Sequence, residues 1–280
     1  MKKKVWFVTG ASKGLGLSLV KKLLKDGYHV AATSRNIDDL QKAVGATDKF
    51  LPLSVDLLNE ESVSQAIQKT ISKFGSLDVV VNNAGYGLAG ALEELSDAET
   101  RANFDVNVFG LLNVIRAAMP QLRKQQSGHI FNIASIAGFT GSFPGFGIYC
   151  ATKFAVHGLS ESLAEEVKAF NVKVTIVSPG YFRTSFLESG SLSVPKNEIK
   201  EYKTVREIQS LHQNDYNGRQ QGDPDKASDA MIRVAESNDS VLHLFLGPDA
   251  YHLAEQKIVA INKDLESVRE LGTKTSFEEA

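Results

Sequence analysis

Val5-Trp6-Phe7-Val8-Thr9-Gly10-Ala11-Ser12-Lys13-Gly14-Leu15-Gly16 is the stretch from which the fold can be predicted. Its first four residues form a compact apolar run of the kind that a buried parallel strand requires. The residues that follow have a helical pattern, with an apolar face made of Leu17, Val20, Leu23 and Leu24. A strand, a glycine loop and a helix in this order direct backbone N–H groups and a helix N-terminus at phosphate. With its spacing G-x-x-x-G-x-G, the stretch predicts nucleotide binding, although the glycines alone would also fit a tight connection.

Further strand-like runs alternate with helical patterns along the chain. Strands are predicted at residues 29–34, 50–55, 77–81, 128–134, 172–177 and 241–246. Helical periodicity covers residues 60–74, 98–125, 151 onward, 223–236 and 250–271, with a short helix at 200–212. This alternation predicts βαβ units and a parallel sheet, and such sheets bind ligands beyond the carboxyl ends of their strands.

The composition is that of an ordinary globular protein, with 42% hydrophobic and 23% charged residues among 280. The net charge of -2 gives no reason to expect nucleic-acid or membrane-surface binding. The apolar run after Lys2-Lys3-Lys4 is too short for a signal peptide or a membrane span. The single cysteine, Cys150, excludes internal disulfides and fits a reducing compartment, so we expect a cytoplasmic protein. Because no repeat or linker divides residues 1–280, we expect one domain.

The end of the second predicted strand, Ser34-Arg35, bears on the choice of cofactor. A protein that selects NAD commonly has an acidic residue here for the ribose hydroxyls, whereas arginine suits the 2′-phosphate of NADP. No acidic residue occurs between Ser34 and Asp38, and Lys13 offers a second positive charge. Both cations would also fit an ordinary solvated surface. The pattern favours NADP(H) over NAD(H).

Polar residues follow the third and fourth predicted strands. Asp56 comes directly after the strand at 50–55, and Asn82-Asn83-Ala84-Gly85 follows the strand at 77–81. Since the carboxyl ends of parallel strands meet at one edge, these residues are expected on the same rim as the glycine loop. The coincidence favours a ligand site at that rim.

Asn107 lies among apolar neighbours within the helical stretch 98–125. An asparagine competes with backbone hydrogen bonding and can open a helix locally. A core asparagine with satisfied hydrogen bonds is the alternative, and the sequence does not choose between the two. Ser135 ends the strand at 128–134.

Tyr149 and Lys153 are four residues apart at the start of a predicted helix. Side chains at this spacing lie on one helix face. A tyrosine has a pKa of about 10 and exchanges protons poorly at neutral pH unless its phenolate is stabilised, which a neighbouring lysine can do. Taken alone the pair also fits a surface helix, so the residues that precede it must support any catalytic interpretation.

Taken together, these motifs closely resemble the short-chain dehydrogenase/reductase family, over roughly residues 4–248. The motifs are Thr9-Gly10-x-x-x-Gly14-x-Gly16, Asp56, Asn82-Asn83-Ala84-Gly85, Asn107, Ser135, Tyr149-x-x-x-Lys153 and Pro179-Gly180 with Thr184. The resemblance implies a doubly wound Rossmann-type α/β fold, with about seven parallel strands and helices on both faces.

The resemblance also implies four catalytic residues. Tyr149 would be the acid/base at the substrate oxygen, and Lys153 would lower the pKa of that tyrosine and hold the nicotinamide ribose. Ser135 would orient the substrate oxygen. Asn107 would hold a water in a proton relay that leads to Lys153. Hydride arriving at a carbonyl carbon builds alkoxide charge, which positioned hydroxyl groups stabilise and protonate.

The cofactor-binding residues follow from the same resemblance. Asp56 would meet the adenine, Asn83-Ala84-Gly85 the adenosine ribose side, and Pro179-Gly180 with Thr184 the nicotinamide end. The full expected set is Thr9, Gly10, Ser12, Lys13, Gly14, Leu15, Gly16, Ser34, Arg35, Asp56, Leu57, Asn83, Ala84, Gly85, Tyr149, Lys153, Pro179, Gly180 and Thr184.

Two segments depart from many members of the family. A long substrate loop is expected at 181–222, and a helical extension at about 250–271 leaves a homodimer and a homotetramer both open. Aromatic residues near the substrate loop fit either an apolar substrate pocket or hinge and core packing: Phe139, Phe143, Phe146, Phe182 and Phe186.

The sequence thus predicts an NADPH-dependent carbonyl reductase or alcohol dehydrogenase for a hydrophobic, bulky or aromatic ketone or secondary alcohol. The alternative of another class is a non-catalytic dinucleotide sensor or scaffold on the same fold. A sensor has no need for Ser135, Tyr149, Lys153 and Asn107 together. No metal is expected, because the six histidines are scattered without a ligand motif.

Overall fold

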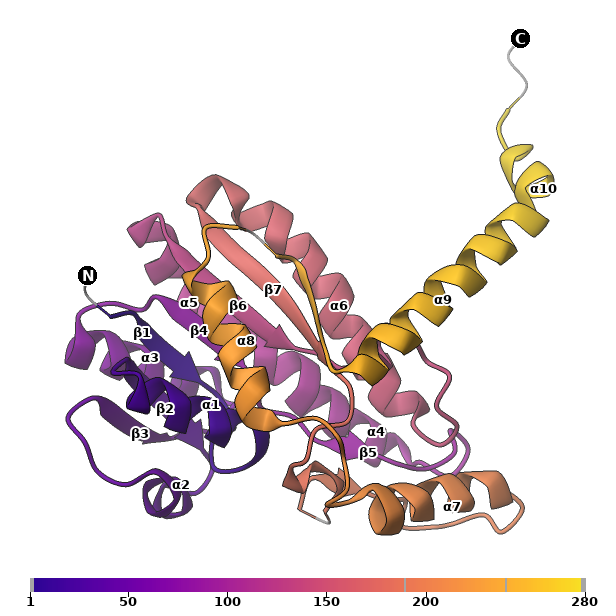
Figure 1. Ribbon diagram of the computed structural model, residues 1–280, viewed down its shortest axis with the longest axis horizontal. Coiled ribbons are helices and arrows are strands. Elements are labelled where there is room, and N and C mark those ends of the chain that lie inside the picture. The colour runs from indigo at the N-terminus through magenta and orange to yellow at the C-terminus, as the bar shows by residue number, and fades with distance from the viewer. Residues whose placement is uncertain (1–2, 189, 240, 278–280) are drawn as a thin grey trace.

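The computed structural model describes residues 3–188, 190–239 and 241–277. Its centre is a seven-stranded parallel sheet in the order β3-β2-β1-β4-β6-β7-β9 (Figure 1). The strands are β1 (Val5–Val8), β2 (His29–Ser34), β3 (Phe50–Ser54), β4 (Val79–Asn82), β6 (Gly128–Ile133), β7 (Val172–Pro179) and β9 (His243–Leu246). The expected Rossmann-type α/β fold is confirmed.

Helices cover both faces of the sheet, and β1 shows why. Successive side chains of a strand point to opposite faces. Trp6 therefore packs in an apolar cluster with α1, α2 and α8, and Phe7 packs in another with α3, α5 and α6. The helices are α1 (Gly14–Lys25), α2 (Ile37–Val44), α3 (Glu60–Phe74), α4 (Asp97–Phe104), α5 (Gly110–Gln125), α6 (Gly147–Val167), α7 (Lys203–Ser210), α8 (Pro224–Glu236), α9 (Pro248–Ser267) and α10 (Arg269–Thr273).

The strand order reverses at the centre of the sheet. From β1 the chain builds outward through β2 and β3, and then returns to the other side of β1 with β4, β6, β7 and β9. Ligands bind in open α/β sheets at such a reversal, beyond the carboxyl ends of the strands. The glycine loop follows β1 and Asn83 follows β4, so both lie at this point.

The helical stretch predicted at 98–125 is broken by one π-helical turn at Asp105–Phe109, between α4 and α5. Asn107 lies in this turn, and the Gly110 N–H bonds the Asp105 carbonyl at the wider spacing of a π-helix. The local opening that was one alternative for Asn107 is thus confirmed.

Sequence periodicity missed α2 and the two-residue strands β5 (Gly87–Leu88) and β8 (Leu192–Ser193). α2 buries only Leu40 within the helix, but its start was visible, because Asn36 caps the Asp38 N–H at 3.0 Å and acidic residues follow. β5 and β8 pair in parallel across more than one hundred residues, and no local pattern announces such a pair.

Residues 181–222 form a set of short elements between β7 and α8. A bridge between Phe182 and Gly222 brings the ends of this segment together. It contains a 3-10 turn at Ser185–Leu187, then β8, α7 and a π-helical turn at Leu211–Tyr216. Figure 1 shows α7 on the same side of the molecule as β5 and α4.

The chain after β9 is helical, as predicted, but α9 starts at Pro248 because proline suits the first turn of a helix. Its beginning packs on the body through Ala250 and Ala254, and the rest projects away from it (Figure 1). No helix among the described residues is both long enough and apolar enough to pass through a membrane.

Candidate active site

The glycine loop is fixed to the end of β4 by Thr9 and Asn83. Thr9 Oγ1 accepts hydrogen bonds from the backbone N–H groups of Asn83 and Ala84, each at 3.0 Å. In return, Asn83 Nδ2 donates to the carbonyl oxygens of Thr9 and Gly10, each at 2.9 Å. The two side chains therefore hold the floor of the site rather than projecting into it.

Two glycines of the loop are required by this close approach. Gly10 has a φ of 63°, and a Cβ there would lie 2.7 Å from the Ala84 Cα. A Cβ on Gly16 would lie 2.4 Å from Asn83 Nδ2. Alanine at either position would push the loop away from β4.

The N-terminus of α1 has no side-chain cap. Lys13, the residue before the helix, is extended, and neither a capping hydrogen bond nor an acidic residue occurs in the first turn. The free N–H groups and the helix dipole are thus available to an anion. Ser12, Gly14 and Leu15 lie half-buried around this turn. Lys13 Nζ donates to the Gly190 carbonyl at 2.8 Å, so this lysine connects the loop to residues 181–222.

Ser34 and Arg35 end β2, next to the glycine loop in the sheet order. The Ser34 hydroxyl accepts from the Asn36 N–H at 3.3 Å, and the Arg35 carbonyl accepts from Ser54 Oγ at 3.1 Å. The Arg35 side chain is exposed, and within the described part of the chain it forms no ion pair. Its guanidinium remains available to an anionic group at this edge.

Asp56 and Leu57 follow β3 on the same rim. The exposed Asp56 carboxylate accepts from the Leu58 N–H at 3.0 Å, which closes a tight turn. The Leu57 carbonyl accepts from Asn113 Nδ2 at 2.8 Å, so α5 fixes this turn.

Tyr149, Lys153 and Ser135 meet where β6 ends and α6 begins. Lys153 Nζ lies 5.9 Å from the Tyr149 ring centre and donates to the Ile133 carbonyl at 2.8 Å. Ser135 Oγ accepts from the Ala137 N–H at 3.1 Å, and its hydroxyl lies beside the Tyr149 phenol. Tyr149 and Lys153 are only 8% and 5% exposed, so the site buries one ammonium and one phenol together.

The protonation of the pair differs from the expectation that Lys153 lowers the pKa of Tyr149. Burial raises the pKa of Tyr149 above its usual value, and the neighbouring Ser135 side chain only partly opposes this effect. Burial also lowers the pKa of Lys153 to about 8. The pKa of Tyr149 stays raised because the Lys153 ammonium donates to the Ile133 carbonyl and does not offset the cost of a buried phenolate. The Tyr149 phenol is therefore neutral at pH 7.

The Asn107 side chain is fully used by the protein. Its Oδ1 accepts from the Tyr86 N–H at 3.0 Å, while Nδ2 donates to the Tyr86 carbonyl at 3.0 Å and to Thr152 Oγ1 at 3.1 Å. Thus the helix opens at Asn107 and its amide is also satisfied in the core. A Cβ on Gly85 would lie 2.9 Å from Asn107 Oδ1 and 3.6 Å from Lys153 Nζ, so the turn adjoins the lysine.

Pro179 is the last residue of β7, and Gly180 and Thr184 follow it. Thr184 caps a short turn by accepting from the Phe186 N–H at 3.3 Å, and its Cβ lies 3.8 Å from the position of a Cβ on Gly14. Asp249 of α9 is the residue that the sequence did not indicate. Its Oδ2 accepts from the Tyr181 N–H at 2.7 Å and would lie 2.2 Å from a Cβ on Gly180.

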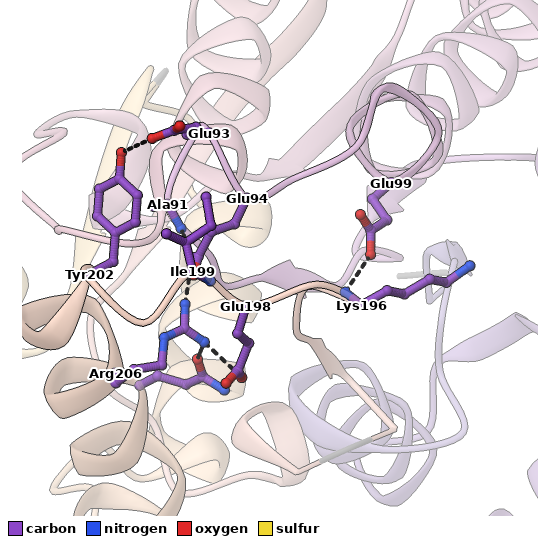
Figure 2. A network of polar contacts seen from close by, with 10 residues as sticks. Ala91, Glu93, Glu94, Glu99, Lys196, Glu198, Ile199, Tyr202 and Arg206 are labelled. Carbon is purple, nitrogen blue, oxygen red and sulfur yellow. Dashed lines mark hydrogen bonds and ion pairs between the residues drawn. The ribbon is translucent and has the colours of Figure 1, made fainter.

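A polar network anchors residues 196–206 to residues 91–99 (Figure 2). The fully buried Glu94 carboxylate accepts from the Ala91 N–H at 2.7 Å, from the Ile199 N–H at 2.8 Å and from Arg206 Nη2 at 2.5 Å. Figure 2 also shows Tyr202 bonded to Glu93, and the Lys196 backbone bonded to Glu99. This anchor fixes one side of the segment 181–222.

The aromatic residues separate into two groups. Phe146, Phe143 and Phe186 join Tyr149 in one apolar cluster, and the rings of Tyr149 and Phe186 lie 5.9 Å apart. Phe139 instead packs edge-on against Phe245 on another side. Phe182 packs with the core next to α8. Phe143, Phe146 and Phe186 thus lie beside Tyr149, whereas Phe139 and Phe182 pack elsewhere.

Two histidines that are distant in the sequence meet at the far side of α6. His157, Glu161 and His243 offer ligand atoms within 4.8 Å of one another. However, His157 Nε2 lies 3.0 Å from Ser178 Oγ. Burial lowers the pKa of this histidine to about 4. His157 Nε2 is thus already engaged with Ser178.

A family model described as short chain dehydrogenase matches residues 4–192. The chain is 35% identical to oxidoreductase BOA17 of Botryotinia fuckeliana over 271 residues, which cover 96% of this chain and 97% of that protein. It is also 35% identical to a 3-ketodihydrosphingosine reductase of Bacteroides thetaiotaomicron, with 89% of both chains covered.

Solved structures show the same similarity. A short-chain dehydrogenase from Streptomyces avermitilis matches with a TM-score of 0.89 and 35% identity, covering 98% of this chain and all of that one. A 3-ketoacyl-(acyl-carrier-protein) reductase from Brucella melitensis in complex with NADH matches at 0.72, with 25% identity and coverage of 87% and 96%. An alcohol dehydrogenase from Thermococcus sibiricus in complex with 5-hydroxy-NADP matches at 0.70, with 27% identity and coverage of 88% and 96%.

Proposed function

The chain belongs to the short chain dehydrogenase family, and from this premise we propose that it is an NADPH-dependent carbonyl reductase, reversible as an alcohol dehydrogenase. The observation that carries the proposal is the group formed by half-buried Ser135 and buried Tyr149 and Lys153 at the carboxyl ends of the central strands. The substrate would be a hydrophobic ketone or secondary alcohol.

The residues present fit a dinucleotide. The uncapped N-terminus of α1 offers N–H groups for its phosphates, and Gly10 lets the backbone approach without a side chain. Asp56, Leu57 and Asn83-Ala84-Gly85 would line the adenosine side. Pro179, Gly180 and Thr184 would line the nicotinamide end. When bound, the nicotinamide cofactor supplies the hydride.

The chain's own residues would then orient the substrate and move a proton. The Ser135 hydroxyl donates a hydrogen bond to the substrate oxygen, and Tyr149 Oη gives its proton to that oxygen as negative charge develops on it. The raised pKa of Tyr149 supports this direction, because a neutral phenol is the form that donates. Lys153 holds the nicotinamide ribose and returns a proton to the phenol. The turn at Asn107 adjoins Lys153 and would be where a proton relay to this lysine begins.

Selection of NADP(H) over NAD(H) is proposed for Arg35. The chain has no acidic residue near the end of β2 before Asp38, and the Arg35 side chain is exposed. Proteins similar to this chain bind NADP-type and NAD-type cofactors, so the family does not decide the question. Arg35→Asp should raise the Kd for NADPH about 10-fold or more and leave NADH nearly unchanged, since it removes a charged partner of the 2′-phosphate. An unchanged NADPH/NADH ratio, measured by fluorescence titration, would remove Arg35 from this role.

An apolar substrate is supported by the cluster around Tyr149. Phe146 and Phe186 lie in it with Leu187 and Leu192, and the cluster adjoins the anchored segment 196–206. The relative named as a 3-ketodihydrosphingosine reductase is consistent with a ketone as the reacting group. We further propose that residues 1–280 act as one Rossmann domain in which 181–222 is the substrate loop. The single, buried Cys150 is consistent with a cytoplasmic protein.

The decisive experiment uses Tyr149→Phe with a panel of hydrophobic ketones. Wild-type protein should oxidise NADPH, and the variant should lose about 10²-fold or more in kcat while the Kd for NADPH stays within about threefold, because only the proton donor is removed. Tyr28→Phe is the matched control, since its phenol bonds Glu236 at 3.1 Å beside α8. Retained turnover in Tyr149→Phe would refute the mechanism. NADPH binding without turnover by the wild-type protein on any ketone or alcohol would favour the sensor alternative.

A further inference from the structure

The projecting part of α9 carries an apolar stripe that the body of the protein does not cover. Ile258, Ile261 and Leu265 are 48%, 43% and 56% exposed, and Val268 follows at the end of the helix with 53%. These four residues, called the α9 stripe below, are spaced 3, 4 and 3 residues apart. This is the a/d spacing of a coiled-coil seam, so all four lie along one side of the helix.

The stripe continues the line along which α9 joins the body. Tyr251 and Ala254 occupy the two preceding positions of the same repeat; Ala254 is buried against the body, and Tyr251 packs on Phe245. Beyond Ala254 the helix extends outward (Figure 1). The side that is apolar at the base therefore stays apolar where nothing within the chain reaches it.

Charges beside the stripe indicate what covers it. Lys257 and Asp264 occupy equivalent positions one heptad apart, and neither forms an ion pair with another described residue. In an antiparallel pair of identical helices, residues at this flanking position face each other. Each Lys257 would then meet the Asp264 of the other copy, twice across a twofold axis.

The surrounding shape also favours the antiparallel arrangement. Paired helices lie about 8–10 Å apart, whereas a domain of about 250 residues has a radius of gyration of about 18 Å. Two parallel α9 helices would bring both bodies to the same end, where they would overlap. In the antiparallel arrangement Ile258 faces Ile261 of the other copy, and the two bodies lie at opposite ends of the helix pair.

We propose that α9 is a dimerisation arm, in which the α9 stripe packs antiparallel against that of a second copy of this chain. A membrane surface is the less suitable occupant. α9 carries four acidic residues and two basic ones, Lys257 and Lys263, instead of the basic excess of interfacial helices. The arm is distinct from the active site, so the proposal does not depend on the proposed function.

The first test compares molar mass by light scattering after size exclusion at about 50 µM. Ile258→Asp/Leu265→Asp should halve the mass of the wild-type assembly, because it puts charges into the paired stripe. Val259→Asp is the matched control, since Val259 is 67% exposed on the same helix but outside the stripe. It should leave the mass unchanged. Circular dichroism should show the wild-type helix content in both variants.

The second test concerns direction. Lys257→Asp should weaken the dimer about 10-fold by opposing two carboxylates, and Lys257→Asp/Asp264→Lys should restore it. If the helices were parallel, the double variant would not restore the dimer, because the lysine introduced by Asp264→Lys would then face Arg269 of the other copy. A monomeric wild-type protein, a mass unaffected by Ile258→Asp/Leu265→Asp, or an equal loss in Val259→Asp would overturn the proposal. So would a monomer that binds vesicles of phosphatidylcholine and phosphatidylglycerol through the stripe.

Discussion

Replacing Thr9 by valine isolates the contact that holds the glycine loop to β4. The Thr9 side chain is 1% exposed, and its hydroxyl is the acceptor for the Ala84 N–H at 3.0 Å and a second acceptor for the Asn83 N–H. The Asn83 N–H also has the Val81 carbonyl at 3.1 Å. Valine has nearly the same shape as threonine, so Thr9→Val removes the hydroxyl and little else.

The expected loss follows from these bonds. A buried N–H group left without its acceptor costs about 1–3 kcal/mol, and the loss of a further hydrogen bond costs about 1 kcal/mol. Thr9→Val should therefore lower the free energy of unfolding by about 3 kcal/mol. Thr9→Ser is the matched control because it keeps the hydroxyl and removes one buried methyl group, at about 1 kcal/mol.

Urea unfolding measures the difference, with the fluorescence of Trp6 as the probe, since the only tryptophan is fully buried on β1. With a slope of about 3 kcal/mol per molar urea, the midpoint should fall by about 1 M in Thr9→Val and by about 0.3 M in Thr9→Ser. NADPH should also bind more weakly to Thr9→Val, because Ala84 and Gly10 lose their fixed separation. Equal midpoints for the two variants would show that the hydroxyl does not hold the loop.

Two further predictions concern Lys153 and Glu94. Burial lowers the pKa of Lys153 to about 8, so the folded protein loses this proton at a lower pH than the unfolded chain, which keeps it up to about 10.5. Without cofactor, the free energy of unfolding of the wild-type protein, relative to that of Lys153→Met, should therefore rise by about 2 kcal/mol between pH 7 and 9.5. A difference between the two proteins that does not change with pH in urea titrations would contradict this prediction. Glu94→Gln should cost about 2 kcal/mol and raise KM for the ketone without changing the Kd for NADPH, because it leaves Arg206 without its buried carboxylate. Glu198→Gln, which removes an exposed carboxylate from the same Arg206, should change stability by less than about 1 kcal/mol, and equal effects of the two variants would show that the anchor is not at Glu94.

Local patterns were sufficient for the central sheet. The runs at β1, β2 and β7 are apolar enough to be buried on both faces, and glycine was needed at Gly10 and Gly16 because backbone and side chains approach closely there. A local opening of the helix at Asn107 was one of the two alternatives that the sequence offered, since an asparagine among apolar residues competes for backbone hydrogen bonds. Such features depend on residues that are close in sequence.

Contacts between distant residues were decided by the tertiary structure. The sequence placed Tyr149 beside Lys153 and so suggested a lowered phenol pKa, but the ammonium bonds the Ile133 carbonyl and burial raises that pKa instead. Asp249 reaches the Tyr181 N–H across the end of β7, and no local pattern indicates it. Spacing alone determined which residues of this chain share a strand or a helix face. What each side chain bonds, and which proton it keeps, depended on burial and on partners that only the folded chain brings together.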